Sequence, residues 1–219
     1  VRKLERGDVD MGVLGDTGMS AYFGMRDIAK PTAQDCVLIS GAGGAVGTIA
    51  GQIAKLEGAR VVGIVGSQAK ADWLCHSLGY DAAVLRRGDT PLPDAIQAAC
   101  PDGIDVFFDN VGGQSLEAAI TNMNHRGRLV LCGAISGYGV TPHGPGNLFE
   151  VVTKELSIEG FMTHFRHERY DEARDQLSNW LREGIIQSPE HRMVGIENVG
   201  KAFADLFAGE NFGKTIVEL

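Results

Sequence analysis

Short apolar runs alternate with longer amphipathic stretches along most of this chain, from residue 36 onward. The runs are rich in β-branched residues and predict six strands, at residues 36–40, 60–65, 82–85, 104–109, 128–132 and 157–162. Helical spacing of apolar positions predicts helices between and after them, at 45–57, 68–78, 91–99, 113–123, 147–154 and 168–183. Strand, helix and strand in succession form right-handed βαβ units, so this order predicts a parallel sheet.

The predicted strands show little alternation between apolar and polar positions. Runs such as Val106-Phe107-Phe108 are typical of strands that helices cover on both faces. The predicted fold class is therefore α/β, with a doubly wound, six-stranded parallel sheet of the Rossmann type in the order 3-2-1-4-5-6.

The two ends of the chain lie outside this repeating pattern. A helix is predicted at 17–29, with Thr17 as its N-cap and Pro31 ending it. We expect residues 1–16 and 191–219 to be remnants of a second domain, flanking a nucleotide-binding domain of residues 17–190. The last segment predicts a helix at 199–208 and a strand at 214–219.

A glycine-rich turn joins the first strand directly to a helix. Gly41, Gly44 and Gly47 give a G-x-x-G-x-x-G spacing, a variant of the dinucleotide fingerprint G-x-G-x-x-G. Such a turn lets backbone N–H groups and a helix N-terminus approach a pyrophosphate. The turn therefore predicts a dinucleotide site.

The second strand ends without the carboxylate that an NAD site places on the adenosine ribose. Gly66, Ser67 and Lys70 stand there instead, and a hydroxyl and an ammonium suit a 2′-phosphate. This favours NADP over NAD. In the alternative interpretation, Ser67 is only a helix N-cap and Lys70 is a solvated helix residue.

Polar residues also follow the fourth and fifth strands. Asn110 precedes a glycine pair, and Tyr138 lies on the loop after the fifth strand. Ligands bind at the carboxyl ends of such strands, so Asn110 is expected to face the nicotinamide and Tyr138 to offer a proton or hold a substrate carbonyl. Alternatively, Asn110 only forms a turn and Tyr138 is a half-buried aromatic residue.

Composition excludes several classes of function. A net charge of −8 argues against nucleic acid as a partner, and the sequence contains no apolar run of membrane-spanning length. The four scattered cysteines predict buried, reduced thiols in a cytoplasmic protein. The histidines show no metal-ligand spacing beyond the pair His164 and His167, so no metal is predicted. The sequence begins at Val1, which is typical of a fragment or a processed product.

Six motifs occur in order along the chain, at residues 15–24, 44–47, 66–70, 108–113, 132–136 and 209–214. Together they resemble zinc-independent medium-chain dehydrogenases/reductases, specifically the branch of prostaglandin reductases, leukotriene B4 12-hydroxydehydrogenases and alkenal double-bond reductases. The resemblance spans essentially the whole chain. It implies NADPH-dependent reduction of the C=C bond of α,β-unsaturated ketones and aldehydes by a homodimer, with no metal.

The resemblance also implies a set of cofactor contacts. The glycine turn would wrap the pyrophosphate, Lys70 would bind the 2′-phosphate, and the loop at 132–138 would line the nicotinamide. Tyr138 matches a tyrosine proposed to assist protonation. The implied contacts are Thr17, Gly44, Ala45, Val46, Gly47, Ser67, Lys70, Arg86, Asn110, Cys132, Gly133, Ala134, Ile135, Ser136, Tyr138, Phe161, Met162, Thr163 and Asn211.

The chain departs from the family pattern in two ways. Leu85-Arg86-Arg87 stands where the family has Asn-Tyr-Lys, so an aromatic contact is replaced by Arg86, which can still grip or stack near a phosphate. The family's N-terminal GroES-like domain, which forms the other wall of the substrate cleft, is largely absent. Its absence predicts uncovered apolar surface at the two ends of this chain.

Three hypotheses follow from the sequence. The first is the nucleotide-binding portion of an NADPH-dependent enone or alkenal reductase. The second is a free-standing NADP-binding module with a regulatory role and no chemistry. The third is an NADPH quinone reductase of the same superfamily.

Overall fold

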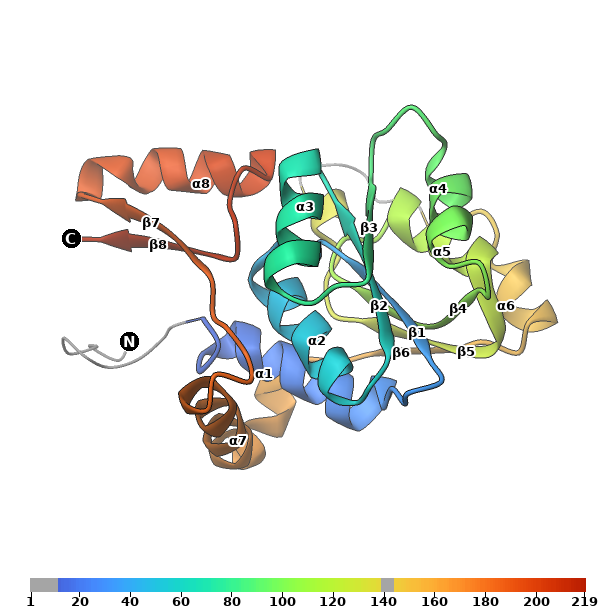
Figure 1. Cartoon of the computed structure of the whole chain (residues 1–219), viewed down its shortest axis with the longest axis horizontal. Coiled ribbons are helices and arrows are strands. Elements are labelled where there is room, and N and C mark those ends of the chain that lie inside the picture. The colour runs from blue at the N-terminus through green and yellow to red at the C-terminus, as the bar shows by residue number, and fades with distance from the viewer. Residues whose placement is uncertain (1–11, 139–143) are drawn as a thin grey trace.

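Six parallel strands form the central sheet of the protein, in the order β3-β2-β1-β4-β5-β6 (Figure 1). The structure, a computed structural model, describes residues 12–138 and 144–219. Both the α/β class and the strand order agree with the sequence prediction. The strands are β1 (Cys36–Ser40), β2 (Arg60–Val65), β3 (Ala82–Leu85), β4 (Ile104–Asp109), β5 (Met123–Leu131) and β6 (Ser157–Gly160).

Helices cover the sheet on both faces, which explains the lack of alternation along the strands. In β1, Val37 and Ile39 pack into one buried cluster and Leu38 packs into another on the opposite face. The first cluster includes side chains of α1 (Asp16–Phe23), α2 (Ala45–Leu56), α3 (Gln68–Ser77) and α7 (Tyr170–Arg182). The second includes α4 (Leu92–Ala99) and α5 (Gln114–Asn122), and α6 (Phe149–Thr153) contributes Val151 at its margin.

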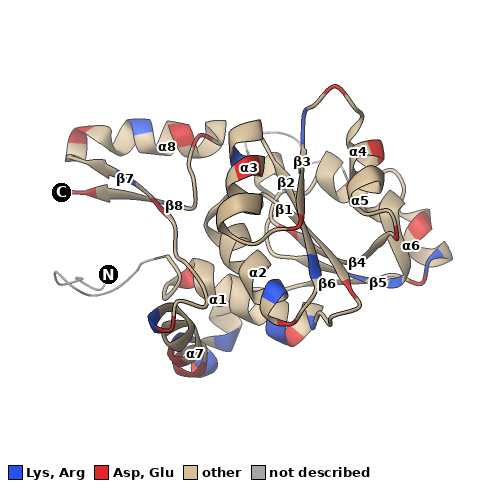
Figure 2. Ribbon diagram, viewed as in Figure 1, with Lys and Arg blue, Asp and Glu red and all other residues tan. Residues whose placement is uncertain are grey.

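Burial is uneven among these helices. In α2, eight of the twelve residues are buried, and Lys55 is its one charged residue (Figure 2). By contrast, only Ala173 and Leu177 of α7 are buried, and acidic and basic residues populate the rest of that helix. Helix α2 therefore belongs to the core, and α7 is an outer covering helix.

The N-terminal helix differs in detail from the prediction. Its N-cap is Gly15, and Thr17 lies inside the helix with Oγ1 donating to the Gly12 carbonyl at 2.7 Å, so the prediction of Thr17 as N-cap was wrong. The predicted helix 17–29 is α1 followed by one stretch of π-helix, Gly24–Ala29. Lys30 then adopts a left-handed conformation with φ 45° and ends the helix just before Pro31.

Three strands in the C-terminal half of the chain differ from the sequence prediction. Strand β5 begins at Met123 rather than 128, and its polar start pairs with β4 only through a register shift between Ile104 and Val106. Strand β6 ends at Gly160, two residues before the predicted end. Strand β7 (Glu190–Val194) was not predicted, because Glu-His-Arg-Met-Val is no apolar run.

The last segment forms a small unit beside the main sheet (Figure 1). Strand β7 pairs in parallel with β8 (Lys214–Glu218), and α8 (Val199–Ala208) connects them. Large apolar side chains of this unit are exposed, as the missing-domain argument predicts; they are Val194, Ile196, Val199, Phe203, Leu206 and Phe207. The remaining predicted segment, residues 1–16, lies mostly outside the described residues.

Candidate functional site

The glycine turn is closed tightly by its own backbone. Gly41 adopts φ 59°, and the Gly44 N–H donates to the Gly41 carbonyl at 3.0 Å. A Cβ on Gly47 would lie 2.5 Å from that same carbonyl oxygen and 2.6 Å from Ala42 Cα, so no side chain fits there. Gly44 is the N-cap of α2, and the N–H groups of the first helical turn have no partner within the helix. The turn thus presents an anion-binding helix N-terminus.

The chain segment before β8 lies across this turn. The Gly213 N–H donates to the Gly43 carbonyl at 2.9 Å, and Gly44 and Gly213 form an isolated parallel bridge. Asn211 is buried, and its Nδ2 donates to the Gly213 carbonyl at 2.8 Å. The structure therefore brings the predicted residue Asn211 to the glycine turn from the far end of the sequence.

Lys70 is buried beside the same turn, with 6% of its surface exposed. Its stem packs against Gly43, where an added Cβ would lie 3.0 Å from Lys70 Cδ, and its ammonium lies 5.6 Å from the centre of the Phe212 ring. The interpretation of Lys70 as a solvated residue was wrong. Desolvation lowers the Lys70 pKa, and the charge of Glu210 opposes this.

The Lys70 ammonium has no carboxylate at ion-pair distance within the part of the chain that the structure describes. Buried charges are ordinarily paired, because removing them from water is costly. Ser67 caps α3, with its Oγ accepting the Lys70 N–H at 3.4 Å, so the N-cap interpretation of Ser67 describes the structure. An unpaired, buried cation beside a helix N-terminus fits an anionic ligand.

Strand β4 ends in a buried hydrogen-bonded turn. Asp109 Oδ1 accepts from the Ser40 hydroxyl at 2.6 Å and from the N–H groups of Val111 and Gly112 at 2.9 Å each. Asn110 donates from Nδ2 to the Ser40 carbonyl at 2.7 Å. Asp109 Oδ2 is buried and has no partner among the described residues. Asp109 thereby fixes the turn that carries Asn110 at the carboxyl edge of the sheet.

The buried state of Asp109 predicts a pH dependence of stability. Burial raises the Asp109 pKa, although hydrogen bonds from Gly112, Ser40 and Val111 oppose the rise. The folded state then holds a proton that the unfolded chain releases, so this contribution to stability is lost as pH rises above the ordinary pKa of 3.8. Asp109→Asn has no carboxyl group at this position and should not lose this stability. In urea unfolding at a series of pH values, the free energy of unfolding of wild type should therefore fall relative to that of the variant as pH rises toward neutral.

Asp81 provides a control, because its pKa shift and the resulting pH dependence of stability have the opposite sign. Although burial raises its pKa, hydrogen bonds from the Val61 N–H and Lys55 outweigh this and lower it. A lowered pKa contributes stability above pH 3.8 that is lost as pH falls through the folded-state value. Wild type should therefore gain stability over Asp81→Asn as pH rises. Parallel pH curves for wild type and Asp109→Asn would contradict the buried-proton argument.

The loop after β5 lies directly against the Asp109 turn. The N–H groups of Cys132 and Gly133 donate to the Asp109 carbonyl at 2.9 and 3.0 Å, and the Ser136 hydroxyl donates to the Val111 carbonyl at 2.6 Å. Burial raises the Cys132 pKa to about 12, which keeps this thiol protonated at neutral pH. At the end of the described loop, Tyr138 is 65% exposed. Residues 139–143, including His143, lie outside the described residues.

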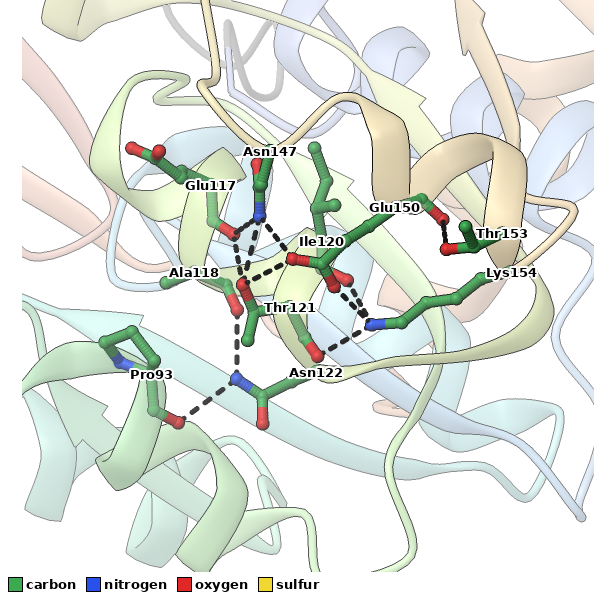
Figure 3. A network of polar contacts seen from close by, with 10 residues as sticks. All are labelled: Pro93, Glu117, Ala118, Ile120, Thr121, Asn122, Asn147, Glu150, Thr153 and Lys154. Carbon is green, nitrogen blue, oxygen red and sulfur yellow. Dashed lines mark hydrogen bonds and ion pairs between the residues drawn. The ribbon is translucent and has the colours of Figure 1, made fainter.

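Beyond that gap, a polar network fixes the chain to α5 (Figure 3). Asn147 Nδ2 donates to the Glu117 carbonyl and to the Thr121 hydroxyl, both at 3.0 Å. Lys154 Nζ donates to the Ile120 and Thr121 carbonyls at 2.9 and 2.7 Å, which satisfies carbonyls at the C-terminal end of α5. Hydrogen bonds thus hold the described residues on each side of this gap to neighbouring elements.

The other predicted contacts fall into two places. Thr163 is buried and donates to Asp16, while Phe161 lies under the Arg166 guanidinium at 5.5 Å and Met162 is 55% exposed. These residues follow β6 at the same edge of the sheet. Arg86, after β3, borders a cavity of about 370 Å³ between the 86–93 loop and the start of α5; its other lining residues include Arg87, Pro91, Gln114 and Glu117.

The site also contains residues outside the sequence-based set. Phe212 covers Lys70 and packs edge-on against Trp73, with ring centres 5.2 Å apart. Asp109 organises the turn after β4. Both belong to motifs that the resemblance rests on, and an aromatic residue inside the 209–214 motif was the available signal for Phe212.

Comparison with known families identifies the family of this chain. The family described as "Zinc-binding dehydrogenase" matches residues 45–179, more than half of the chain. The chain therefore belongs to this family, part of the medium-chain dehydrogenase/reductase superfamily. Within the described ranges, no group of three or more His, Cys, Asp or Glu side chains is placed to hold a metal ion.

Individual relatives define the branch. The chain is 44% identical to prostaglandin reductase 1 of Bos taurus, over 95% of this chain and 64% of that protein. It is 37% identical to the NADP(+)-dependent 2-alkenal reductase of Nicotiana tabacum, over 94% of this chain and 60% of that protein. It falls in the prostaglandin reductase and alkenal reductase branch, and spans less than two thirds of these relatives.

A solved structure shows the same arrangement. CurA from Vibrio vulnificus in complex with NADPH superposes with a TM-score of 0.88 at 36% identity, covering 94% of this chain and 63% of CurA. The relative was solved with the dinucleotide whose site the glycine turn predicts. No helix in the described part of this chain is long and apolar enough to cross a membrane.

Proposed function

We propose that this chain is the NADPH-binding portion of an oxidoreductase that reduces the C=C bond of α,β-unsaturated ketones and aldehydes. The observation that carries the proposal is Lys70, a buried ammonium without a carboxylate partner in the described structure, beside the glycine turn. The names of the relatives, which include an NADP(+)-dependent 2-alkenal reductase, support the reaction class.

The residues at the turn fit the two charged parts of NADPH. The N–H groups of Ala45, Val46 and Gly47 face the pyrophosphate from the start of α2. Lys70 and the Ser67 hydroxyl bind the 2′-phosphate, which neutralises the buried ammonium. Arg86, which borders the cavity, would hold the adenine end of the cofactor, because its planar guanidinium can stack on a base.

The carboxyl ends of β4, β5 and β6 hold the nicotinamide half. Asn110 and residues 133–136 would form one side of the nicotinamide site and Phe161–Thr163 another, and Asn211, beside the glycine turn, would complete the cofactor's cradle. NADPH supplies the hydride when bound. Tyr138, exposed at the end of its loop, donates a proton to the substrate, and its hydroxyl stabilises negative charge on the carbonyl oxygen.

The rest of the protein completes the substrate cleft. We place the domain boundary near residue 190, since β7, β8 and α8 form a unit with an exposed apolar surface. A further domain covers this surface in the whole protein, which we propose is a cytoplasmic homodimer.

The function is tested by nucleotide titration and by turnover of the whole protein. NADPH should bind more tightly than NADH, and the whole protein should oxidise NADPH with enones and enals. Tyr138→Phe is expected to lower the enone rate roughly 10²-fold, the scale of general acid catalysis, at nearly unchanged NADPH affinity. Equal affinity for the two nucleotides would overturn the NADP assignment, and an unchanged rate would remove Tyr138 from the mechanism.

The same assay separates the alternatives. Turnover of quinones without turnover of enones would identify a quinone reductase. NADPH binding by the whole protein without oxidation by any of these substrates would identify a regulatory binding module.

A further inference from the structure

The Lys70 side chain is held between the glycine turn and the aromatic ring of Phe212. Its ammonium lies 5.6 Å from the centre of that ring, close enough for attraction by the negative face of the ring. Its stem packs against the turn, where a Cβ added to Gly43 would lie 3.0 Å from Lys70 Cδ and 3.6 Å from Cε. Only 6% of the Lys70 surface is exposed. Phe212 therefore both attracts the ammonium and helps to exclude water from it.

The Phe212 ring is itself fixed in place. The next residue, Gly213, donates its N–H to the Gly43 carbonyl at 2.9 Å, which holds the backbone of this segment on the glycine turn. Trp73 packs edge-on against the ring, with centres 5.2 Å apart. Trp73 follows Lys70 by three residues on α3, so the two side chains lie on the same face of the helix. The position of the ring over the ammonium is thus set by both neighbouring segments.

We propose that Phe212 is a positioning residue that determines the preference for NADPH over NADH, by holding the Lys70 ammonium oriented and free of water where the 2′-phosphate binds. This inference rests on the proposed function, in which Lys70 binds that phosphate. Because the ammonium is already desolvated and its stem already ordered, the phosphate binds without most of the cost of ordering and desolvating them. Exclusion of water also strengthens the attraction between the two charges. NADH has no 2′-phosphate and gains from neither effect.

The test is a double-mutant cycle on the 219-residue chain, in which the ratio of NADPH affinity to NADH affinity is measured. Phe212→Leu keeps an apolar side chain over Lys70 but has no aromatic face, and it should lower the ratio about three- to tenfold. Phe212→Tyr keeps the ring and should retain the wild-type ratio. In a Lys70→Met background, Phe212→Leu should leave the ratio unchanged, because the ring acts through the ammonium.

The affinity ratio separates this role from a structural one. If Phe212 only held residues 209–214 on the turn, its replacement would weaken NADPH and NADH by the same factor. An unchanged ratio in Phe212→Leu, with wild type still preferring NADPH, would overturn this inference alone. Equal affinities in wild type would overturn the proposed NADP site and this inference with it. Phe149→Leu is the matched control, since Phe149 is 75% exposed on α6, on the other face of the sheet from α3, and should change neither affinity.

A second measurement uses wild type and needs no variant to fold. Trp73 contacts the Phe212 ring, whereas Trp180, the other tryptophan of the sequence, packs against Tyr22. Adenosine 2′,5′-bisphosphate and adenosine 5′-monophosphate differ only in the 2′-phosphate. The tryptophan emission should therefore shift with the bisphosphate and not with the monophosphate. Identical emission spectra with the two nucleotides would overturn the proposal, because the 2′-phosphate would then lie away from Phe212 and Trp73.

Discussion

Replacing Gly47 with alanine is expected to reduce the free energy of unfolding by about 1–3 kcal/mol, the usual cost of overpacking a well-packed site. The added methyl would meet the Gly41 carbonyl oxygen at 2.5 Å and Ala42 Cα at 2.6 Å. Both are backbone atoms of the turn, so relief requires α2 to move away from β1. Urea unfolding measures the loss.

The displacement of α2 in Gly47→Ala should also weaken NADPH binding by about tenfold or more. Each N–H aimed at the pyrophosphate contributes roughly 1 kcal/mol, and misaligning two of them is enough for that factor. Fluorescence titration of the reduced nicotinamide measures the affinity. NADH should lose affinity in parallel, because the pyrophosphate is common to both nucleotides.

Gly200→Ala is the matched control. Gly200 lies within α8, where an added Cβ meets nothing within 4 Å, so this variant should gain up to about 1 kcal/mol of stability from helix propensity. Its nucleotide affinity should be unchanged. Gly47→Ala with wild-type stability and wild-type NADPH affinity would show that the turn is not as constrained as its geometry indicates.

Replacing Lys70 with methionine is expected to weaken NADPH binding by about 10- to 100-fold, the range that corresponds to a lost charge-assisted hydrogen bond. NADH lacks the 2′-phosphate, so its affinity should change little. Methionine keeps the apolar stem that packs between Gly43 and Phe212. The nucleotide-free protein should therefore be at least as stable as wild type, because the variant removes a buried charge that has no carboxylate partner among the described residues.

A loss of NADPH affinity without a loss of stability distinguishes a role of Lys70 in ligand binding from a structural role. A structural lysine would lose stability on replacement and leave the NADPH to NADH affinity ratio unchanged. Lys55→Met is the control, since Lys55 pairs with Asp81 at 2.9 Å on the surface and should leave that ratio unaltered. An unchanged ratio in Lys70→Met would place the 2′-phosphate elsewhere.

The sequence predicted the sheet well where burial alone defines a strand. Strands β1, β2 and β4 are apolar runs buried on both faces, and all three were predicted with correct bounds. Prediction failed where a segment is a strand because it pairs with another strand, and not because its side chains are apolar. Glu190–Val194 becomes β7 only because β8 lies beside it, and no local pattern records that partner.

The residues of the candidate site also differ in how far the sequence alone could predict them. The glycine turn, Ser67 and Lys70 are close in sequence, and local spacing was enough to make them candidates. Asn211 reaches the turn through a long-range contact, so it entered only through the resemblance. The burial of Lys70 under Phe212 depends on packing between distant segments, which periodicity does not encode. The same holds for the Asp109 oxygen that has no partner among the described residues.

The bridge between Gly44 and Gly213 has a consequence for the order of folding. Contacts between segments so far apart in sequence carry a large loop-closure entropy and form late. The six-stranded sheet can assemble from earlier residues, but the phosphate cradle is complete only once residue 213 has been synthesised and has docked. A ligand stabilises only states that contain its site. Under the proposed function, NADPH would therefore stabilise only states of the chain in which this bridge has formed.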